Sequence, residues 1–400
     1  MLTSTLNNTL KKFFLFLFIL TGFLLPGQSA AADSVSKQNK SPANTIVIAG
    51  TKYSSDTETL DLSNLLPEDV SEAAEKLPQF TKLKKVILSP EDENGNEGFG
   101  FLTFEEFRPL ADAAPDAEFV FSFELFHQTL STDRTEEILF KRLQDVNDEA
   151  VDKIDEVLPY LKNLKTLSFN RCPASDERLD ALRAKYPEIT VRWVVQFAAF
   201  SAWSDTDRIW AMAGLYHDED AVNLKYFHDL RYLDIGHNGL TKCGFLYEMP
   251  ELEVLIIAIG NLEDITPVSS LKKLEYLEIC DTQVTDLTPL SSCTTLEHLN
   301  LGGIPATDLS PLYPLKNLKR LYADNMFSIP EIDRLNYEAE FRELLPNAEI
   351  SFLMGPGGGV ENGYWRYSRG PYTGSFVERY ALLREQFGYD HDYNQAYVYD

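Results

Sequence analysis

The sequence predicts an α/β solenoid, a stack of short repeated units whose parallel strands form one continuous, curved sheet. The main observation is the phrase L-x-x-L-x-L, which recurs with a period of 22 residues and begins at Leu230, Leu252, Leu274, Leu296 and Leu318. A second phrase, an aspartate followed three residues later by proline, keeps step with it at Asp264, Asp286 and Asp308. Units of this size cannot bury their apolar face alone, so they must stack.

The spacing within each unit predicts its structure, and the period and phrase are the signature of a leucine-rich repeat. Positions are counted here from the first leucine of each repeat. Side chains alternate along a strand, so positions 1, 4 and 6 are expected to point into the core and positions 3 and 5 onto the concave face. The proline at position 16 removes a backbone donor, and 22 residues leave room only for one strand and a short 3₁₀ or extended return.

The first 32 residues have the pattern of a signal peptide. Lys11 and Lys12 precede the apolar run 13–25, and a breaker and Ala30-Ala31-Ala32 follow it. A run of 13 residues is shorter than the roughly 20 that span a bilayer. We therefore expect residues 1–32 to be cleaved and the mature chain to be secreted or extracellular, with attachment to the cell surface as an alternative. Residues 33–45 are polar and predicted to be a disordered leader.

Longer, helical leucine-rich repeats are predicted over residues 46–200. Amphipathic stretches at 68–80, 103–114 and 175–186 alternate with strand phrases. Thr103 with Glu106 forms a capping-box pattern, and Ser175 followed by two acids is a second helix start. Residues 201–229 lack a clear repeat phrase and are predicted to be an irregular transition to the 22-residue repeats of 230–327.

The C-terminal part is predicted to close the solenoid. Ser328 with Glu331 reads as a capping box that opens a helix, and residues 328–354 are the expected cap. A Gly-rich linker follows at 355–363, and then a tail at 364–400 with eleven aromatic residues and a short helix near its centre. The tail is expected to dock on the solenoid, with a carbohydrate-binding aromatic platform as the alternative.

The proline phrase and leucine phrase of residues 230–327 resemble the internalin-type repeat. The usual asparagine at position 9 survives only as Asn238, so the resemblance implies an incomplete asparagine ladder. Residues 46–200 resemble the ribonuclease-inhibitor class of the fold. As a whole, with Arg379-Tyr-Ala-Leu-Leu-Arg384-Glu385 near its end, the chain resembles secreted leucine-rich-repeat proteins of anaerobic Firmicutes. That resemblance implies the fold but does not define an activity.

Composition limits the partners. The chain has 62 acidic and 36 basic residues and a net charge of −26, which repels nucleic acid and anionic membranes. Two of the four cysteines, Cys243 and Cys293, occupy core positions two repeats apart, about 10 Å along the stack and beyond disulfide reach. We expect no structural disulfide, no cofactor, no metal site and a monomer.

The expected ligand-binding residues are positions 3 and 5 of the five repeats. Mixed aromatic, amide and charged side chains on one face are typical of protein and glycan recognition. They are Tyr232, Val254, Tyr276, His298 and Arg320 at position 3, and Asp234, Ile256, Glu278, Asn300 and Tyr322 at position 5.

Three functions fit these observations. The first is a non-enzymatic recognition protein that binds a protein or glycan through this concave face. The second is an extracellular hydrolase of glycans, with a site near the tail or the 201–229 segment, although no catalytic motif is present in the sequence. The third is a structural protein of the cell envelope.

Overall fold

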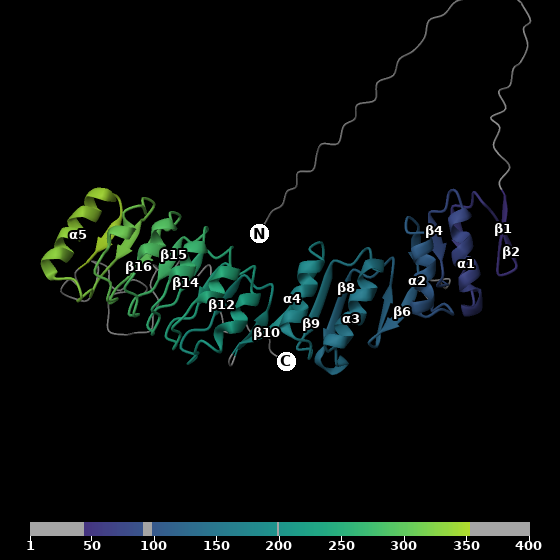
Figure 1. Ribbon diagram of the computed structural model, residues 1–400, viewed down its shortest axis with the longest axis horizontal. Coiled ribbons are helices and arrows are strands. Elements are labelled where there is room, and N and C mark those ends of the chain that lie inside the picture. Colours follow the sequence, from purple (N-terminus) through teal and green to yellow (C-terminus); the bar gives the residue numbers. More distant parts are fainter. Residues whose placement is uncertain (1–43, 91–97, 198–199, 353–400) are drawn as a thin grey trace, which may run out of the picture. The chain divides into compact units, whose positions relative to one another are not determined.

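The computed structural model describes residues 44–90, 98–197 and 200–352. The expected signal peptide, the Gly-rich linker, the aromatic tail and nearly all of the expected leader lie outside these residues. Figure 1 shows the elements in chain order, from β1 to α5, and β18 is the last described element.

The first described part begins with an antiparallel hairpin and continues with a parallel sheet. The hairpin consists of β1 (Thr45–Ile48) and β2 (Thr51–Ser54). The sheet has the order β3 (Thr59–Asp61), β4 (Lys85–Ile87) and β5 (Glu118–Val120). Its connections contain η1 (Pro67–Asp69), α1 (Val70–Lys76), η2 (Leu77–Gln79) and α2 (Phe104–Ala113).

A second hairpin and a four-stranded sheet follow. The hairpin pairs β6 (Ser122–Leu125) with β7 (Gln128–Ser131). The sheet has the order β11 (Phe200–Trp203), β10 (Thr190–Phe197), β9 (Thr166–Asn170) and β8 (Glu137–Lys141), and β11 alone runs antiparallel to its neighbour. Its connections contain η3 (Arg142–Gln144), α3 (Asp148–Val157), η4 (Leu158–Tyr160) and α4 (Asp176–Lys185).

Local capping confirms two predicted helix starts. At α2, the backbone N–H of Glu106 donates to Thr103 Oγ1 at 3.3 Å, and the Thr103 N–H donates to Glu106 Oε2 at 2.7 Å. At α4, Ser175 Oγ accepts from the N–H of Arg178 at 3.3 Å. These bonds satisfy backbone donors that have no partner within the first helical turn.

The 22-residue repeats form a seven-stranded parallel sheet. Its strands, in order, are β12 (Arg208–Trp210), β13 (Tyr232–Asp234), β14 (Val254–Ile256), β15 (Tyr276–Glu278), β16 (His298–Asn300), β17 (Arg320–Tyr322) and β18 (Glu349–Ser351). The return segments are η5 (Ala221–Tyr226), η6 (Gly244–Glu248), η7 (Thr266–Ser270), η8 (Thr288–Ser292) and η9 (Ser310–Leu312), and α5 (Glu331–Leu344) precedes β18. The strands pair in register, so the predicted parallel sheet and its short 3₁₀ returns are confirmed.

The prediction of one continuous sheet is wrong. The parallel strands fall into sheets of three, four and seven strands. The physical reason lies at β10. Its first half, residues 190–193, pairs in parallel with β9, and its second half, residues 194–197, pairs with the antiparallel return strand β11. The return strand therefore occupies the sheet edge that the next repeat would use. The hairpin of β6 and β7 follows β5 in the same way.

The helix of the C-terminal cap begins later than predicted. Helix α5 starts at Glu331, and its N-cap is Pro330, with no side-chain cap. The capping box expected from Ser328 is therefore wrong. Pro330 has an extended ψ of 145°, and its ring is compatible with the first turn of a helix but cannot continue one toward Ser328.

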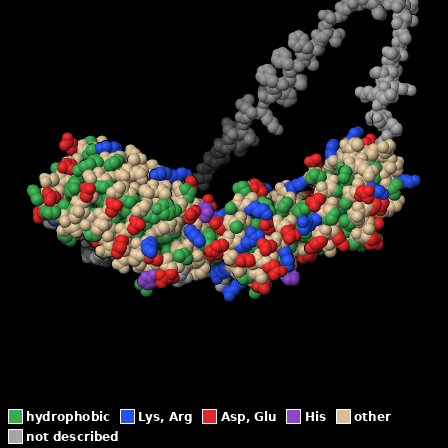
Figure 2. All heavy atoms as spheres, in the orientation of Figure 1, with side chains coloured by type: hydrophobic (Ala, Val, Ile, Leu, Met, Phe, Trp, Pro, Cys, Tyr) green, Lys and Arg blue, Asp and Glu red, His purple; other side chains and the backbone are tan. Residues whose placement is uncertain are grey.

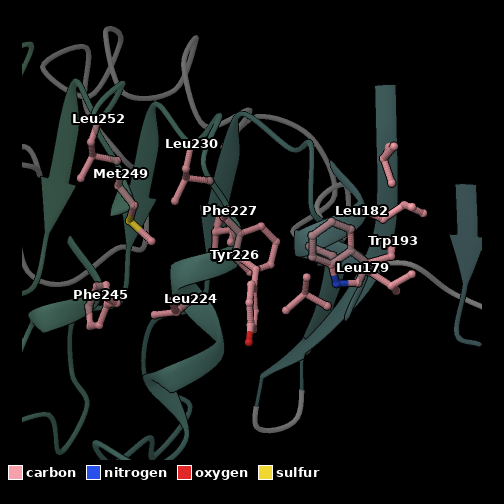
Figure 3. Packing of buried hydrophobic residues seen from close by; sticks show 14 of the residues in the cluster. Leu179, Leu182, Trp193, Leu224, Tyr226, Phe227, Leu230, Phe245, Met249 and Leu252 are labelled. Carbon is pink, nitrogen blue, oxygen red and sulfur yellow. The ribbon is translucent and has the colours of Figure 1, made fainter. Parts of the chain in front are cut away.

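A main hydrophobic core runs through all three sheets. Figure 3 shows it at the junction between the helical and the 22-residue repeats, where Trp193 of β10 and Tyr226 of η5 have ring centroids 6.1 Å apart. Leu230 and Leu252 continue the core into the repeats and are fully buried. All four cysteines are free, and Cys243 and Cys293 are buried.

Candidate binding surface

The structure brings all ten predicted residues together on one face of the seven-stranded sheet, named here the column face. Position 3 pairs across the strands from Tyr232 to Arg320, and position 5 pairs from Asp234 to Tyr322. Parallel strands lie about 4.8 Å apart, so each column places side chains at that interval.

The column face is more buried than an exposed strand surface. Asp234, Ile256 and Glu278 are 0% exposed, and Tyr276 is 5% exposed. Eight of the ten residues are buried, and only His298 and Arg320 are partly exposed. The buried apolar members form a second hydrophobic cluster, separate from the main core, together with Ala258 and with the partly buried Trp210 and Cys280.

The three tyrosines of the column face each donate their hydroxyl to a glutamate. Tyr232 donates to Glu253 Oε2 at 3.2 Å, and Tyr322 donates to Glu349 Oε1 at 2.9 Å. Tyr276 donates to Glu278 within the same strand. The Arg231 guanidinium also lies 5.0 Å from the centroid of the Tyr232 ring. These contacts fix the aromatic rings, and fixed rings lose little conformational freedom when they bind a ligand.

Position 5 also shapes the strand exits. Asp234 Oδ1 accepts from the N–H of Gly236 at 3.1 Å, and Asn300 Oδ1 accepts from the N–H of Gly302 at 3.0 Å. The chain then turns through a left-handed residue at position 8 of every repeat: His237, Ile259, Asp281, Gly303 and Asn325 have φ between 54° and 75°. Glycine and asparagine adopt this conformation readily, whereas a β-branched residue such as Ile259 is strained in it.

Two further strands extend the column face, and sequence reasoning missed the first of them, β12. Strand β12 adds Arg208 and Trp210 next to Tyr232 and Asp234. Strand β18 adds Glu349 and Ser351 next to Arg320 and Tyr322. The signal for β12 was weak because 24 residues, not 22, separate it from β13, and it lies inside the segment that was predicted to be irregular.

His298 is a titratable group of the face whose pKa is strongly lowered. Burial, and then the charge of Arg320, lower its pKa to about 4. Among the described residues its Nδ1 atom is buried and has no hydrogen-bond partner. The ring of Tyr276 lies beside it, with centroids 5.7 Å apart. His298 is therefore neutral at physiological pH.

A charged row at position 2 borders the column face. Arg231 forms two hydrogen bonds with Glu253, at 2.9 and 2.8 Å, and Lys319 pairs with Glu297 at the other end. Glu275 lies between the two glutamates, and its pKa is raised by burial and then by the charges of Glu297 and Glu253. More widely, acidic and basic side chains are interspersed on the side of the molecule that Figure 2 shows.

Two concavities lie among the helical repeats. One, of about 420 Å³, is lined by Phe107, Asp112, Phe119, Tyr160 and Lys162 among others. The other, of about 310 Å³, lies on β8, β9 and β10 and contains Glu137, Arg192 and Asp205. In it Arg192 donates to Ser168 Oγ at 3.0 Å and to Asp205 Oδ2 at 3.3 Å.

In the described part of the chain, no three His, Cys, Asp or Glu side chains gather in a metal-binding group. Burial raises the pKa of the thiols of Cys172 and Cys243 to about 11 and about 12, so both are protonated at neutral pH. None of the described helices combines the length and apolar character that a bilayer crossing requires.

No protein-family model and no curated protein matches the chain. Among solved structures, internalin C2 of Listeria monocytogenes is 21% identical, covers 48% of this chain and 63% of its own, and has a TM-score of 0.29. A second L. monocytogenes internalin is 16% identical, covers 69% of this chain and 64% of its own, and has a TM-score of 0.29. A leucine-rich-repeat protein of Leptospira interrogans is 16% identical, covers 69% and 74%, and has a TM-score of 0.33.

The chain thus spans 63% and 64% of the two internalins that it matches. The leucine-rich-repeat fold rests on the chain's own geometry, in which strands of the L-x-x-L-x-L phrase pair in register every 22 residues.

Proposed function

We propose that the protein is a secreted or cell-surface recognition protein that binds a protein or glycan partner through the column face. The observation that carries the proposal is the in-register array of the face over five neighbouring strands. The array combines tyrosine rings with a histidine, an arginine, an asparagine and two carboxylates, arranged around apolar Val254 and Ile256. Aromatic side chains with few rotamers, next to charged groups that set orientation, are the usual anchors of protein interfaces.

Sequence features support the proposed location and repeat type. The signal-peptide pattern of residues 1–32 supports export. Asp264, Asp286 and Asp308 each accept, through Oδ1, the N–H two residues ahead at 2.8 to 2.9 Å, and so start a 3₁₀ return at the proline. This repeated turn supports the assignment of residues 230–327 to internalin-like repeats.

Capture by the full-length secreted protein tests the function. The probes are a glycan array and a panel of purified cell-surface and secreted proteins. Arg320→Glu changes a partly exposed residue of the column face, and Lys316→Glu makes the same charge change at an exposed site in the turn before β17. We expect Arg320→Glu to weaken capture at least about tenfold, which corresponds to about 1.4 kcal/mol, while Lys316→Glu has no effect.

A ligand that both variants capture like the parent would refute binding at the column face. Circular dichroism and the unfolding midpoint of each variant are needed as well, since Arg320 pairs with Glu349 at 3.4 Å. An unfolded variant cannot be compared, and Arg320→Gln then replaces it.

One observation favours glycan hydrolysis as a second candidate. The 310 Å³ concavity holds two carboxylates, Glu137 and Asp205, beside Arg192, and Asp205 belongs to the 201–229 segment. Glycosidases use paired carboxylates of this kind as acid and base or nucleophile. Turnover of a glycan panel that Glu137→Gln abolishes would support hydrolysis, and binding without turnover would favour recognition.

A further inference from the structure

The burial of the column face points to an occupant. A strand face that meets solvent leaves its large side chains substantially exposed, yet Tyr232, Val254 and Tyr322 are 5%, 2% and 4% exposed. Among the described residues, the hydrophobic side chains that pack together on this face all belong to the sheet strands or their exits, and no described helix contributes one. Neighbours within a sheet cover the sides of one another's side chains but not the surface that points away from the sheet, so the near-complete burial of this face points to a further segment over it.

We propose that the aromatic tail of the same chain, residues 364–387, occupies the column face and that a ligand must displace it. The displacement by a ligand rests on the proposed function, whereas the occupancy of the face by the tail does not. The occupancy itself depends on the composition, reach and charge of the segment.

The composition of the segment matches the face. Residues 364–387 contain seven aromatic side chains, and Phe376, Tyr380, Leu383 and Phe387 recur at helical spacing as one apolar stripe. The column face offers a complementary cluster of Tyr232, Val254, Ile256, Tyr276 and Tyr322. Burial of apolar surface is favourable, so pairing the two surfaces stabilises both.

The reach of the segment is sufficient. Strand β18, the last strand of the sheet, ends at Ser351, and the Gly-rich segment 355–363 separates it from the tail. The seven strands span about 29 Å at about 4.8 Å per interval, and nine extended residues cover about 30 Å at about 3.3 Å each. The tail can therefore start at either edge of the face.

Charge favours the same pairing. The whole chain has a net charge of −26, but residues 364–387 contain four arginines, Arg366, Arg369, Arg379 and Arg384, against two acids, Glu378 and Glu385. The column face buries two carboxylates, Asp234 and Glu278. A guanidinium is the cation best suited to a buried carboxylate, because it forms paired hydrogen bonds and is weakly hydrated.

Photo-crosslinking in the full-length protein tests the occupancy without any ligand. Tyr276 is replaced by the photoreactive amino acid p-benzoylphenylalanine, and exposed Tyr247 of η6, which is 54% exposed, is replaced in a control. We expect the Tyr276 probe to crosslink within its own chain to residues 364–387, as mapped by mass spectrometry, and the Tyr247 probe not to do so. Crosslinks between two copies, or crosslinks that never reach the tail, would overturn the proposal.

Hydroxyl-radical footprinting of the unsubstituted chain gives a second readout in case the probe disturbs folding. Tyr232, Tyr276 and Tyr322 should be oxidised far more slowly than Tyr247. When Phe376, Tyr380 and Phe387 are changed to serine, the oxidation rate of the three tyrosines of the column face should rise toward that of Tyr247. In a control variant, exposed Phe327 and Leu335 are changed to serine. The tyrosines of the column face should stay protected in this variant.

Equal oxidation of the face in the parent and the tail variant would show that the tail does not cover it. Because neither readout requires a ligand, this failure is distinct from the failure of the recognition function. If the occupancy holds and the function is right, the tail variant captures its ligand more tightly than the parent does.

Discussion

The hydroxyl of Ser204 accepts a hydrogen bond from the backbone N–H of Trp193 at 3.1 Å, and the Ser204 N–H donates to the Trp193 carbonyl at 2.7 Å. Thr132 makes the same pair of bonds with Phe121, at 3.1 and 3.0 Å. Each hydroxyl residue follows the return strand of a hairpin. A side chain thus replaces a strand partner at the two points where the parallel sheet is interrupted.

Replacement of Ser204 by alanine should destabilise the fold. Ser204 is 0% exposed, and the change leaves the Trp193 N–H without its acceptor, which costs about 1–3 kcal/mol for a buried donor. Urea unfolding followed by tryptophan fluorescence measures the effect. Ser292→Ala, at an exposed serine of η8, is the matched control and should leave the midpoint nearly unchanged. Equal midpoints for both variants would contradict a structural role of the Ser204 hydroxyl.

Gly303→Ala should be strongly destabilising. Gly303 has a φ of 75°, and an added Cβ would lie 2.2 Å from Oδ1 of Asp281. The left-handed conformation alone costs a residue with a side chain about 1–2 kcal/mol, and the Asp281 carboxylate must also move away from the added Cβ. Gly244→Ala is the control, because a Cβ there meets nothing within 4 Å. The prediction is refuted if thermal unfolding gives the two alanine variants the same midpoint.

Asn238 is the single asparagine at position 9 of the repeats. Its replacement should lower the free energy of unfolding more than replacement of Thr282, which occupies the same position two repeats later. Its Nδ2 donates to the carbonyls of Ile235, Gly236 and Ala211 at 2.8 to 3.2 Å, and its Oδ1 accepts from Tyr216 N–H at 3.2 Å. Asn238→Ala leaves several buried groups unpaired, at about 1–3 kcal/mol for each.

Thr282→Val is the comparison for this column. Thr282 is also buried, but its hydroxyl makes one bond, to the Ile279 carbonyl at 2.7 Å, and valine has the same shape. Urea unfolding should therefore show the larger loss for Asn238→Ala. A loss for Thr282→Val as large as that for Asn238→Ala would mean that packing, and not the amide bonds, stabilises position 9.

His298→Asn should change how stability depends on pH. The folded pKa of His298 is about 4, below the ordinary value near 6.5 that applies to the unfolded chain. As pH falls from about 6.5 to about 4, the unfolded chain therefore binds a proton that the folded chain does not, and the parent loses stability. The asparagine variant lacks this loss.

The difference in unfolding free energy between variant and parent should accordingly shift in favour of the variant between pH 7.5 and pH 4.5. Denaturation at several pH values measures it, and other titrating groups cancel in the difference. A difference that does not change with pH would show that His298 is not held neutral by burial.

Much of the architecture was predictable because local rules set it. The 22-residue period defines which residues enter strands, alternation places Leu233 in the main core and Tyr232 and Asp234 on the opposite side, and Thr103 and Ser175 begin their helices as expected. The position of Cys243 in the repeat likewise excluded a disulfide to Cys293.

Tertiary structure decided the rest. Another parallel strand and the return strand β11 compete for the same edge of β10. The repeat period of the sequence does not predict which of them pairs there. The strand β12 joins the sheet because β13 offers an edge, not because of a repeat phrase. Side-chain alternation along a strand predicts the face to which Tyr276 and Glu278 point. It does not predict whether that face is covered. Burial of a strand face depends on which parts of the chain meet there in the fold, and only the folded structure shows that Tyr276 and Glu278 are buried.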